Sequence, residues 1–352
     1  MNRRTFLAAT GVALGALAGC LGAGRESEGG SGPPSTDAPL PLAHSPALLR
    51  EHTVSGGPGK DGIPAIDEPR FVDATAPALD DGDVVFGVEI DGDARAYPQD
   101  VLVWHEIVND TVGGRPVSVT YCPLTGTALG FERGDTSFGV SGDLVNSNLV
   151  MYDRATDSRW PQVVATAIDG PLEGDSLRQF PVVWTTWGRW RTAYPDTDVL
   201  STDTGYVRNY DDDPYGGYNP TTGYYASSGT LFAPLHEDDR FEPKVPFLVT
   251  RGPSSEATDR PSVAVHKATL RERGVLAAGR SLAVSDPTLD TGYLYRTGPD
   301  TPDPGAFSWT DGRVRGPDGT YAPSAVPLPA TTTFDAMWFA WVGFYPETEV
   351  HA

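Results

Sequence analysis

A pattern of tryptophan, tyrosine and proline occurs twice in the chain, at residues 187–199 and 338–350. Both copies read W-x2-W-x3-Y-P-x-T-x-V. Aromatic residues at positions i, i+3 and i+7 share one face of a helix, and the proline that follows ends it. Each copy therefore predicts a short amphipathic helix whose tryptophans pack into a core. Because such a pattern rarely recurs by chance, we expect two related halves, residues 46–205 and 206–352.

The segments around these helices alternate between apolar and polar residues, as strands do. Residues 84–90, a turn at Asp91-Gly92, and residues 94–97 predict a β-hairpin. Pro98 is well placed to open a helix that runs to His105. Further strands are expected at 117–122, 127–131 and 149–152. We therefore predict an α+β fold, mainly β, with two related β-rich halves and short amphipathic helices packed on them.

The charge balance excludes two classes of partner. The chain has 47 acidic and 26 basic residues, which gives a formal net charge of −21. Only Lys60, Lys244 and Lys267 are lysines. Nucleic acids and anionic lipid surfaces both need exposed stripes of lysine and arginine, so neither is an expected partner. High acidity is a means by which halophilic proteins stay soluble in salt, and we expect such a source.

The N-terminus predicts export and a lipid anchor. Arg3 and Arg4 precede an apolar run that is too short to span a bilayer, which indicates a twin-arginine signal over residues 1–19. The run ends in a lipobox-like Leu-Ala-Gly-Cys, so Cys20 is the predicted lipidation site. Residues 20–45 are rich in glycine, serine and proline and predict a flexible tether. We expect a protein held by its lipid on the extracytoplasmic face of the cell membrane. The alternative is an ordinary signal with a chance cysteine.

If Cys20 carries a lipid, Cys122 is left as a lone thiol in an exported protein. It lies at the predicted end of a strand, where Thr125 and turn amides can stabilise a thiolate. His105 is a candidate base. We therefore predict thiol redox or nucleophile chemistry with Cys122, His105 and Thr125 as catalytic residues, acting on a small molecule or a protein thiol. The alternatives are an inert buried cysteine, a histidine that only fills a helix end, and a soft-metal pair of Cys122 and His105.

Three familiar motifs of metal-dependent, hydrolytic and nucleotide-binding enzymes are absent from the sequence. The chain contains no H-E-x-x-H, no G-x-S-x-G and no P-loop. These absences disfavour zinc hydrolases, serine hydrolases and P-loop nucleotide enzymes. We predict no cofactor and no dedicated metal site.

Several motifs stand in an order that resembles the domain-of-unknown-function 3179 family, over roughly residues 60 to 350. The motifs are Asp61-Gly-Ile-Pro-Ala-Ile, Arg95-Ala-Tyr-Pro, His105-Glu-Ile-Val-Asn-Asp, Tyr121-Cys-Pro-Leu, Phe138-Gly-Val-Ser-Gly and Met151-Tyr-Asp-Arg-Ala-Thr-Asp-Ser-Arg-Trp-Pro-Gln. The resemblance implies an exported or lipid-anchored protein of no settled activity, and some members resemble selenoproteins near the Cys-Pro-Leu motif. Many members carry a second cysteine where this chain has Thr125, so the resemblance argues against a disulfide reductase here.

Polar and aromatic residues of these motifs are candidates to line a common binding site. They are Tyr121, Arg95, Ser141, Asp153, Arg154 and Trp160. Asp153 and Arg154 can instead form a structural ion pair at a hairpin end. A tyrosine-rich stretch over 206–225 can bind a cation or a sugar ring, or simply form a solvated surface. Two functional classes remain, which are a thiol enzyme and a non-catalytic binding lipoprotein whose halves form a cleft. A buried sulfur beside an aromatic cleft would favour the second.

Overall fold

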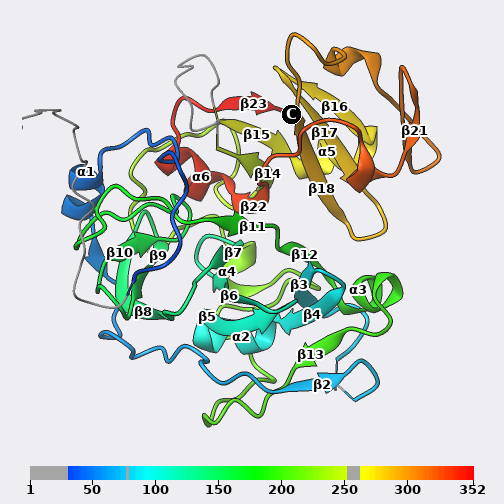
Figure 1. Cartoon of the computed structure of the whole chain (residues 1–352). Helices are drawn as coiled ribbons and strands as arrows, with labels where there is room; N and C mark the ends of the chain where they lie inside the picture. Colours follow the sequence, from blue (N-terminus) through cyan, green and yellow to red (C-terminus); the bar gives the residue numbers. More distant parts are fainter. Residues whose placement is uncertain (1–30, 77–78, 252–261) are drawn as a thin grey trace, which may run out of the picture.

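The computed structural model describes residues 31–76, 79–251 and 262–352 (Figure 1). The predicted 1–19 signal and Cys20 lie outside the described residues. The fold is α+β and mainly β, as expected. The hairpin, the helix after Pro98 and the strands at 117–122, 127–131 and 149–152 are all present. Among the described residues, no helix is long and apolar enough to cross a bilayer.

The first sheet, in the lower part of Figure 1, has the strand order β12-β3-β4-β13-β2. Its strands β12, β3 and β4 are antiparallel, and β13 is parallel to β4. Antiparallel strands can follow one another through tight turns, whereas the parallel partner needs a crossover, which helix α3 supplies here. The bounds are β2 (Phe71–Asp73), β3 (Val84–Ile90), β4 (Asp93–Pro98), β12 (Val183–Thr186) and β13 (Asp198–Leu200).

The second sheet, in the upper part of Figure 1, repeats this arrangement with the order β22-β14-β15-β23. Strands β22, β14 and β15 are antiparallel, and β23 is parallel to β15. The bounds are β14 (Pro246–Thr250), β15 (Val263–His266), β22 (Phe334–Met337) and β23 (Glu349–His351). Each strand of the second sheet thus has a counterpart of the same direction and neighbours in the first. We call residues 84–200 the first unit and residues 246–351 the second unit.

In the chain order of each unit, a group of antiparallel strands lies between two strands of the main sheet. The group follows β4 and precedes the edge strand β12 in the first unit, and it follows β15 and precedes β22 in the second. In the first unit β5 (Ile107–Val112), β6 (Arg115–Cys122) and β7 (Thr127–Glu132) are joined by β11 (Gln179–Phe180). Their counterparts are β16 (Val275–Ala278), β17 (Ser281–Asp286) and β18 (Thr291–Arg296). A further antiparallel sheet follows in each unit. In the first unit its strands are β8 (Phe138–Val145), β9 (Asn148–Asp153) and β10 (Arg159–Pro161), extended by β1 (Val54–Ser55). In the second unit they are β19 (Ser308–Thr310), β20 (Arg313–Gly316) and β21 (Gly319–Tyr321).

The helices are short and occupy matching places. Helices α2 (Gln99–His105) and α5 (Lys267–Arg273) follow β4 and β15, and α3 (Trp187–Ala193) and α6 (Trp338–Phe344) follow the edge strands β12 and β22. Both copies of the aromatic pattern therefore form a helix, which is followed by a strand. The remaining helices are α1 (Pro46–Glu51) and α4 (Gly223–Ala226), the latter in the connection over 201–245.

The two units share a continuous apolar core. Phe131 and Trp160 of the first unit belong to the same buried cluster as Phe247, Trp338 and Trp341 of the second. Burial of so many aromatic rings is the largest favourable contribution to a fold of this kind. The edge strands β12 and β22 contact each other, β22 also packs on β7, and β12 packs on β18.

The end of the predicted tether lies on this body. Thr36 N–H donates to the Ser176 carbonyl at 2.7 Å, and a His44 ring nitrogen lies 2.9 Å from the Gly343 carbonyl oxygen. Residues 36–44 therefore belong to the folded protein.

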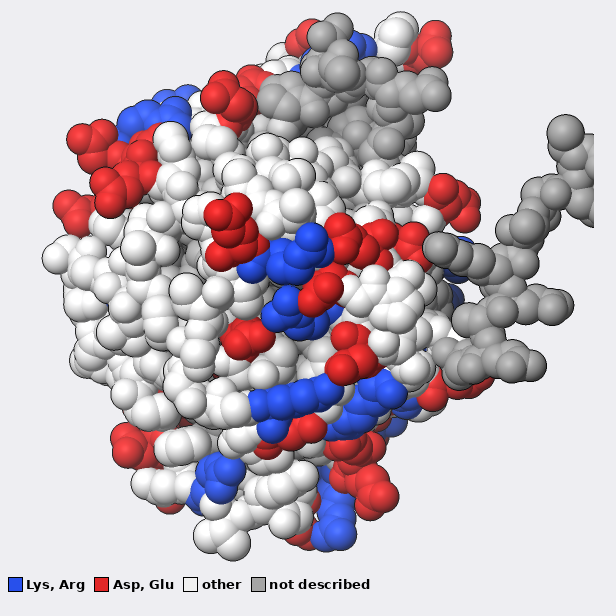
Figure 2. Space-filling model, turned by 90° about the vertical axis from the view of Figure 1, so that its left-hand side faces the viewer, with Lys and Arg blue, Asp and Glu red and all other residues white. Residues whose placement is uncertain are grey.

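Charged residues on the face shown in Figure 2 are interspersed, with acidic and basic side chains next to one another. Many arginines of the described surface pair with aspartates, as Arg159 does with Asp143 and Asp169 at 3.1 and 2.6 Å. Exposed pairs of this kind contribute little to stability. These pairs engage many of the scarce basic residues, so the basic side chains on this face lie next to carboxylates.

Candidate functional site

Cys122 lies at the end of β6, and its side chain is buried, with 1% of the residue exposed. The Leu149 N–H donates to its sulfur at 3.4 Å, and the thiol donates to the Ser147 carbonyl at 3.6 Å. Burial, together with the nearby charge of Glu106, raises the pKa of the Cys122 thiol to about 11, against smaller opposite effects of Thr125 and the Leu149 amide. Because the thiolate is the nucleophile, this environment suppresses reactivity at neutral pH.

Thr125 is close to the sulfur, as expected from the spacing, but its hydroxyl belongs to a buried polar network. It lies 2.8 Å from the Thr127 hydroxyl and accepts from the Asn148 amide at 3.1 Å. Thr127 in turn donates to the Gln162 amide oxygen at 2.6 Å. A fully hydrogen-bonded network of this kind rigidifies the turn that follows Cys122.

His105 is turned to other partners. Its Nδ1 lies 2.7 Å from the Pro64 carbonyl and its Nε2 lies 2.7 Å from the Tyr210 hydroxyl. Burial lowers the pKa of His105. With both ring nitrogens engaged in these bonds, the structure does not pair His105 with Cys122, either as a base or as a second metal ligand. The histidine instead fixes the end of α2 to the segments that carry Pro64 and Tyr210.

Glu106, the next residue, is the acidic neighbour of Cys122. It follows α2 with φ 59° and ψ −27°, a backbone region that non-glycine residues rarely occupy, and the residue is 6% exposed. Burial raises the pKa of Glu106 to about 8. The equivalent position after α5 is Gly274, also with positive φ. The first unit thus keeps a buried carboxyl in a strained position where the second unit has only a glycine.

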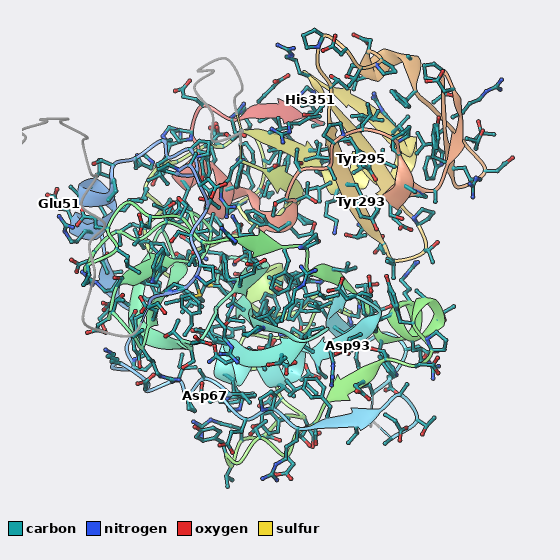
Figure 3. The ribbon with its side chains drawn as sticks, in the orientation of Figure 1. Glu51, Asp67, Asp93, Tyr293, Tyr295 and His351 are labelled. Carbon is teal, nitrogen blue, oxygen red and sulfur yellow. The ribbon has the colours of Figure 1, made fainter. Side chains whose placement is uncertain are left out.

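The family motifs contribute mainly structural contacts. Arg95 pairs with Asp93, labelled in Figure 3, at 2.9 Å and with Asp198 at 3.0 Å. Arg154 donates to both oxygens of Asp67, also labelled there, at 2.7 and 2.8 Å.

The other three motif residues lie in or beside the β8–β9–β10 sheet. Asp153 accepts from the Trp160 indole at 3.0 Å, and the Ser141 hydroxyl donates to the Val150 carbonyl at 2.5 Å. Asp153 and Arg154 do not pair with each other. Among the described residues no hydrogen bond or ion pair joins Arg95, Ser141, Asp153, Arg154 or Trp160 to Cys122, although Trp160 belongs to the same buried cluster as Cys122.

Tyr121 points away from its neighbour Cys122, into a second core. Its hydroxyl lies 3.2 Å from those of Tyr218 and Tyr225, which stack on each other with ring centroids 4.0 Å apart. Gln99 donates to Asp213 at 2.6 Å, and Tyr225 donates to the same carboxylate at 2.8 Å. The tyrosine-rich stretch is therefore packed against the first unit.

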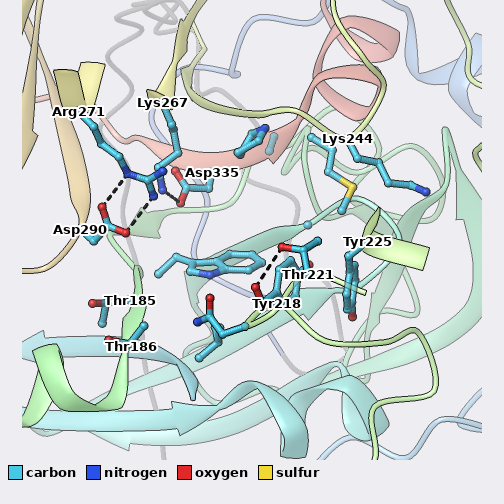
Figure 4. Close-up of a pocket in the computed structure, with 17 residues that line it drawn as sticks. Thr185, Thr186, Tyr218, Thr221, Tyr225, Lys244, Lys267, Arg271, Asp290 and Asp335 are labelled. Carbon is cyan, nitrogen blue, oxygen red and sulfur yellow. Dashed lines mark hydrogen bonds and ion pairs between the residues drawn. The ribbon is translucent and has the colours of Figure 1, made fainter. Parts of the chain in front are cut away.

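Tyr218 and Tyr225 form one wall of a pocket between the two units, with a volume of about 310 Å³ (Figure 4). We call it the interunit pocket. Many of its residues occupy equivalent positions in the two units. The equivalent pairs are Val84 and Pro246, Gly126 and Asp290, Trp184 and Asp335, Thr185 and Ala336, and Thr186 and Met337. The pocket therefore lies where the repeated edge strands β12 and β22 face each other.

Charged groups gather on the second-unit side of the interunit pocket. Lys267 pairs with Asp335, with 8% and 9% of their side chains exposed. Arg271 donates to both oxygens of Asp290 at 2.7 and 2.9 Å. Lys244 precedes the second unit in the chain, lies near Tyr225 in Figure 4, and donates to the Tyr224, Ser227 and Gly229 carbonyls. Two of the three lysines in this acidic chain thus line one pocket.

Two polar atoms at the interunit pocket are buried without a partner among the described residues. They are Oδ1 of Asp335 and the hydroxyl oxygen of Thr185, one from each unit. An unsatisfied buried polar atom costs about 1–3 kcal/mol, so proteins usually avoid it. Both atoms are enclosed by protein, so the pocket residues that a ligand could reach are the other polar and aromatic side chains that line it.

The family model described as "Protein of unknown function (DUF3179)" matches residues 60–348. The chain belongs to this family. The DUF3179 match covers both units and ends close to the last strand, so the family unit is the two-unit body and not one half of it. No curated protein and no solved structure matches the chain.

Within this DUF3179 chain, sequence reasoning missed the residues of the interunit pocket. Trp184, Thr185 and Asp335 stand in no recognisable motif. The signal that could have located them is their position directly before the two copies of the aromatic pattern, which places them on equivalent edge strands. Glu106 stands next to His105 in a family motif, but its positive φ is a property of the folded backbone that no local pattern indicates.

Proposed function

We propose that this protein is an exported, lipid-anchored binding protein that holds a small polar molecule in the interunit pocket. The observation that carries the proposal is the interunit pocket itself, which is about 310 Å³ in volume and places the Trp184 and Tyr218 rings opposite Lys267 and Arg271. Pockets of several hundred Å³ with aromatic walls and a few convergent polar groups are typical of small-molecule sites.

Blocking the mouth of the pocket tests the proposal. Thr221 is exposed and lines the pocket, whereas Thr320 is exposed on β21. We expect at least one compound in a panel of neutral sugars, amino acids, carboxylates and phosphate to raise the melting temperature of the wild type. The Thr320→Trp control should respond equally, and Thr221→Trp should not. At a ligand concentration ten times Kd the stabilisation is about 1.4 kcal/mol. If no compound separates the two variants, the binding proposal is wrong.

Thiol chemistry at Cys122 is the second candidate, and Glu106 favours it. The Glu106 carboxyl lies beside the thiol and, once ionised above its pKa of about 8, can accept the thiol proton, although the Cys122 pKa of about 11 makes this transfer unfavourable in the closed structure. The sulfur must first become accessible, since 1% of Cys122 is exposed. Rapid alkylation of the folded protein near neutral pH would favour this candidate over binding.

Export and anchoring at Cys20 support either activity and are tested separately. We expect Cys20→Ser to move the protein from the membrane fraction to the medium, or to leave an uncleaved precursor. Cys122→Ser, the substitution of the other cysteine, should remain membrane-bound. A normally processed Cys20→Ser protein in the membrane fraction would overturn the lipid anchor. We further propose that the net charge of −21 suits the protein to high salt, where self-repulsion is screened.

A further inference from the structure

We infer that the interunit pocket binds a small carboxylate with an apolar body, and that Arg271 holds the carboxylate group. This inference rests on the proposed binding function and names the ligand class of the same pocket. The features that support it are an excess of positive charge in the lining, a free edge of the Arg271 guanidinium, and an aromatic and apolar wall.

Basic side chains outnumber acidic ones in the lining of the interunit pocket. The charged residues there are Lys244, Lys267, Arg271, Asp290 and Asp335. Lys267 pairs with Asp335, and Arg271 pairs with Asp290. The Lys244 ammonium is bonded to carbonyl and hydroxyl oxygens, and it pairs with no carboxylate among the described residues. One positive charge is therefore left without a counterion, which favours an anionic ligand over a neutral or a cationic one.

The Arg271 guanidinium has an edge that can hold a carboxylate. Its Nε and Nη2 donate to the two oxygens of Asp290 at 2.7 and 2.9 Å. Its Nη1 has no hydrogen-bond partner among the described residues, and together with the second N–H of Nη2 it forms the end-on edge. Two parallel N–H groups on such an edge match the two oxygens of a carboxylate. The side chain is 47% exposed and lines the pocket, so a ligand there can reach it.

Other free groups of the interunit pocket are also donors. Lys267 uses one ammonium N–H for Asp335, and its other two have no partner among the described residues. The indole N–H of Trp184, a half-buried residue that lines the pocket from the first unit, also has no partner there. An ionised carboxylate only accepts hydrogen bonds, whereas a hydroxyl or an amide must also find an acceptor. The free N–H groups therefore favour a carboxylate over a neutral polar group.

The rest of the interunit pocket suits an apolar body. Trp184 meets Tyr218 edge to face, with centroids 5.1 Å apart, and the side chains of Val84 and Met337 also line the pocket. Apolar surface that a ligand covers there is removed from water, which a small inorganic anion cannot do. Figure 4 shows the labelled tyrosines and the Lys267 and Arg271 groups on different sides of the pocket, so one molecule can contact both.

Calorimetric titration of the full chain tests the inference with matched probes. Cyclohexanecarboxylate and benzoate are compared with cyclohexanecarboxamide and benzamide, which have nearly the same shape and no charge. Phosphate and cyclohexylamine serve as an inorganic anion and an organic cation. We expect at least one of the two carboxylates to bind, and its amide to bind about tenfold more weakly or worse.

Variants of Arg271 separate its charge from its geometry. Arg271→Gln removes both and should weaken carboxylate binding by about tenfold or more. Arg271→Lys keeps the charge without the planar edge, and it should also bind more weakly than the wild type. Arg273→Gln is the matched control, because Arg273 is exposed in the last turn of the same helix and is not among the residues that line the pocket. It should bind the carboxylate as the wild type does.

The outcomes separate this inference from the proposed function. If an amide binds as tightly as its carboxylate, or only phosphate or the amine binds, and Thr221→Trp blocks that binding, the carboxylate inference is wrong but the binding function stands. Carboxylate binding that Arg271→Gln or Arg271→Lys leaves equal to the wild type also overturns the inference. If no probe binds in the pocket, both proposals are overturned.

Discussion

The Trp190 indole Nε1 donates to the Thr197 hydroxyl at 3.0 Å, and it closes the loop between helix α3 and strand β13. The second unit repeats this bond from Trp341 to Thr348 at 2.9 Å. In both units the tyrosine after the helix packs on the tryptophan, with centroids 4.2 and 4.4 Å apart. The residues shared by the two copies thus form one local structure. Its aromatic side chains pack in the core, and its threonine hydroxyl accepts a hydrogen bond from the buried indole N–H.

Removing this hydroxyl should cost similar stability in either unit. Thr197→Val and Thr348→Val each leave a buried indole N–H without a partner, and we expect a loss of about 1–3 kcal/mol in the free energy of unfolding. Thr192→Val is the control, because the Thr192 hydroxyl is exposed and bonds only within its helix. Denaturant unfolding measures all three. A loss in only one unit would show that the two bonds are not equivalent.

Glu106 should make the protein less stable as pH rises. Its folded pKa of about 8 lies above the unfolded value of 4.5, so the unfolded chain ionises first. Ionisation of this group does not affect the free energy of unfolding below pH 4.5. As pH rises from 4.5 to 8, the free energy of unfolding falls by a total of about 5 kcal/mol. Glu106→Gln stays neutral and should lack this component. Parallel stability–pH curves for the wild type and the Gln variant would contradict the prediction.

Cys122 should resist alkylation in the folded protein. A pKa raised from 9.0 to about 11 leaves about 100-fold less thiolate at pH 7, and burial hinders access further. We expect iodoacetamide to label the folded Cys20→Ser chain far more slowly than the urea-unfolded chain, with a rate that rises toward pH 11. Stability should fall as pH rises above 9, because the unfolded thiol ionises first. Fast labelling at pH 7 would instead support the thiol candidate.

Thr185→Val should leave the free protein as stable or more stable, by up to about 1 kcal/mol, because it removes a buried hydroxyl without a partner. Thr320→Val is the control, because the Thr320 side chain is exposed on β21. Thermal unfolding measures the effect. A clear loss of stability in the free Thr185→Val protein would show that the hydroxyl has a structural partner.

Local patterns predicted much of the fold. Alternation in residues 84–90 and the Asp91-Gly92 turn led to β3 and β4, and the aromatic pattern led to helices α3 and α6. Each of these features depends on residues within one or two turns of each other, whose periodicity a sequence displays directly.

The contacts of the candidate site residues could not be predicted from local patterns in the same way. His105 stands in a family motif with Cys122, yet its ring bonds to Pro64 and Tyr210. The pocket residues Trp184 and Asp335 are far apart in the chain and share no motif.

The amino-acid sequence by itself determined the strands, the short helices and the repeated aromatic device, because neighbouring residues carry those signals. Only the tertiary structure decided that the Cys122 sulfur is buried beside Glu106, and that the edge strands β12 and β22 enclose a pocket. The physical reason is that burial, and with it the pKa and hydrogen bonding of a side chain, depends on which distant segments exclude water from it.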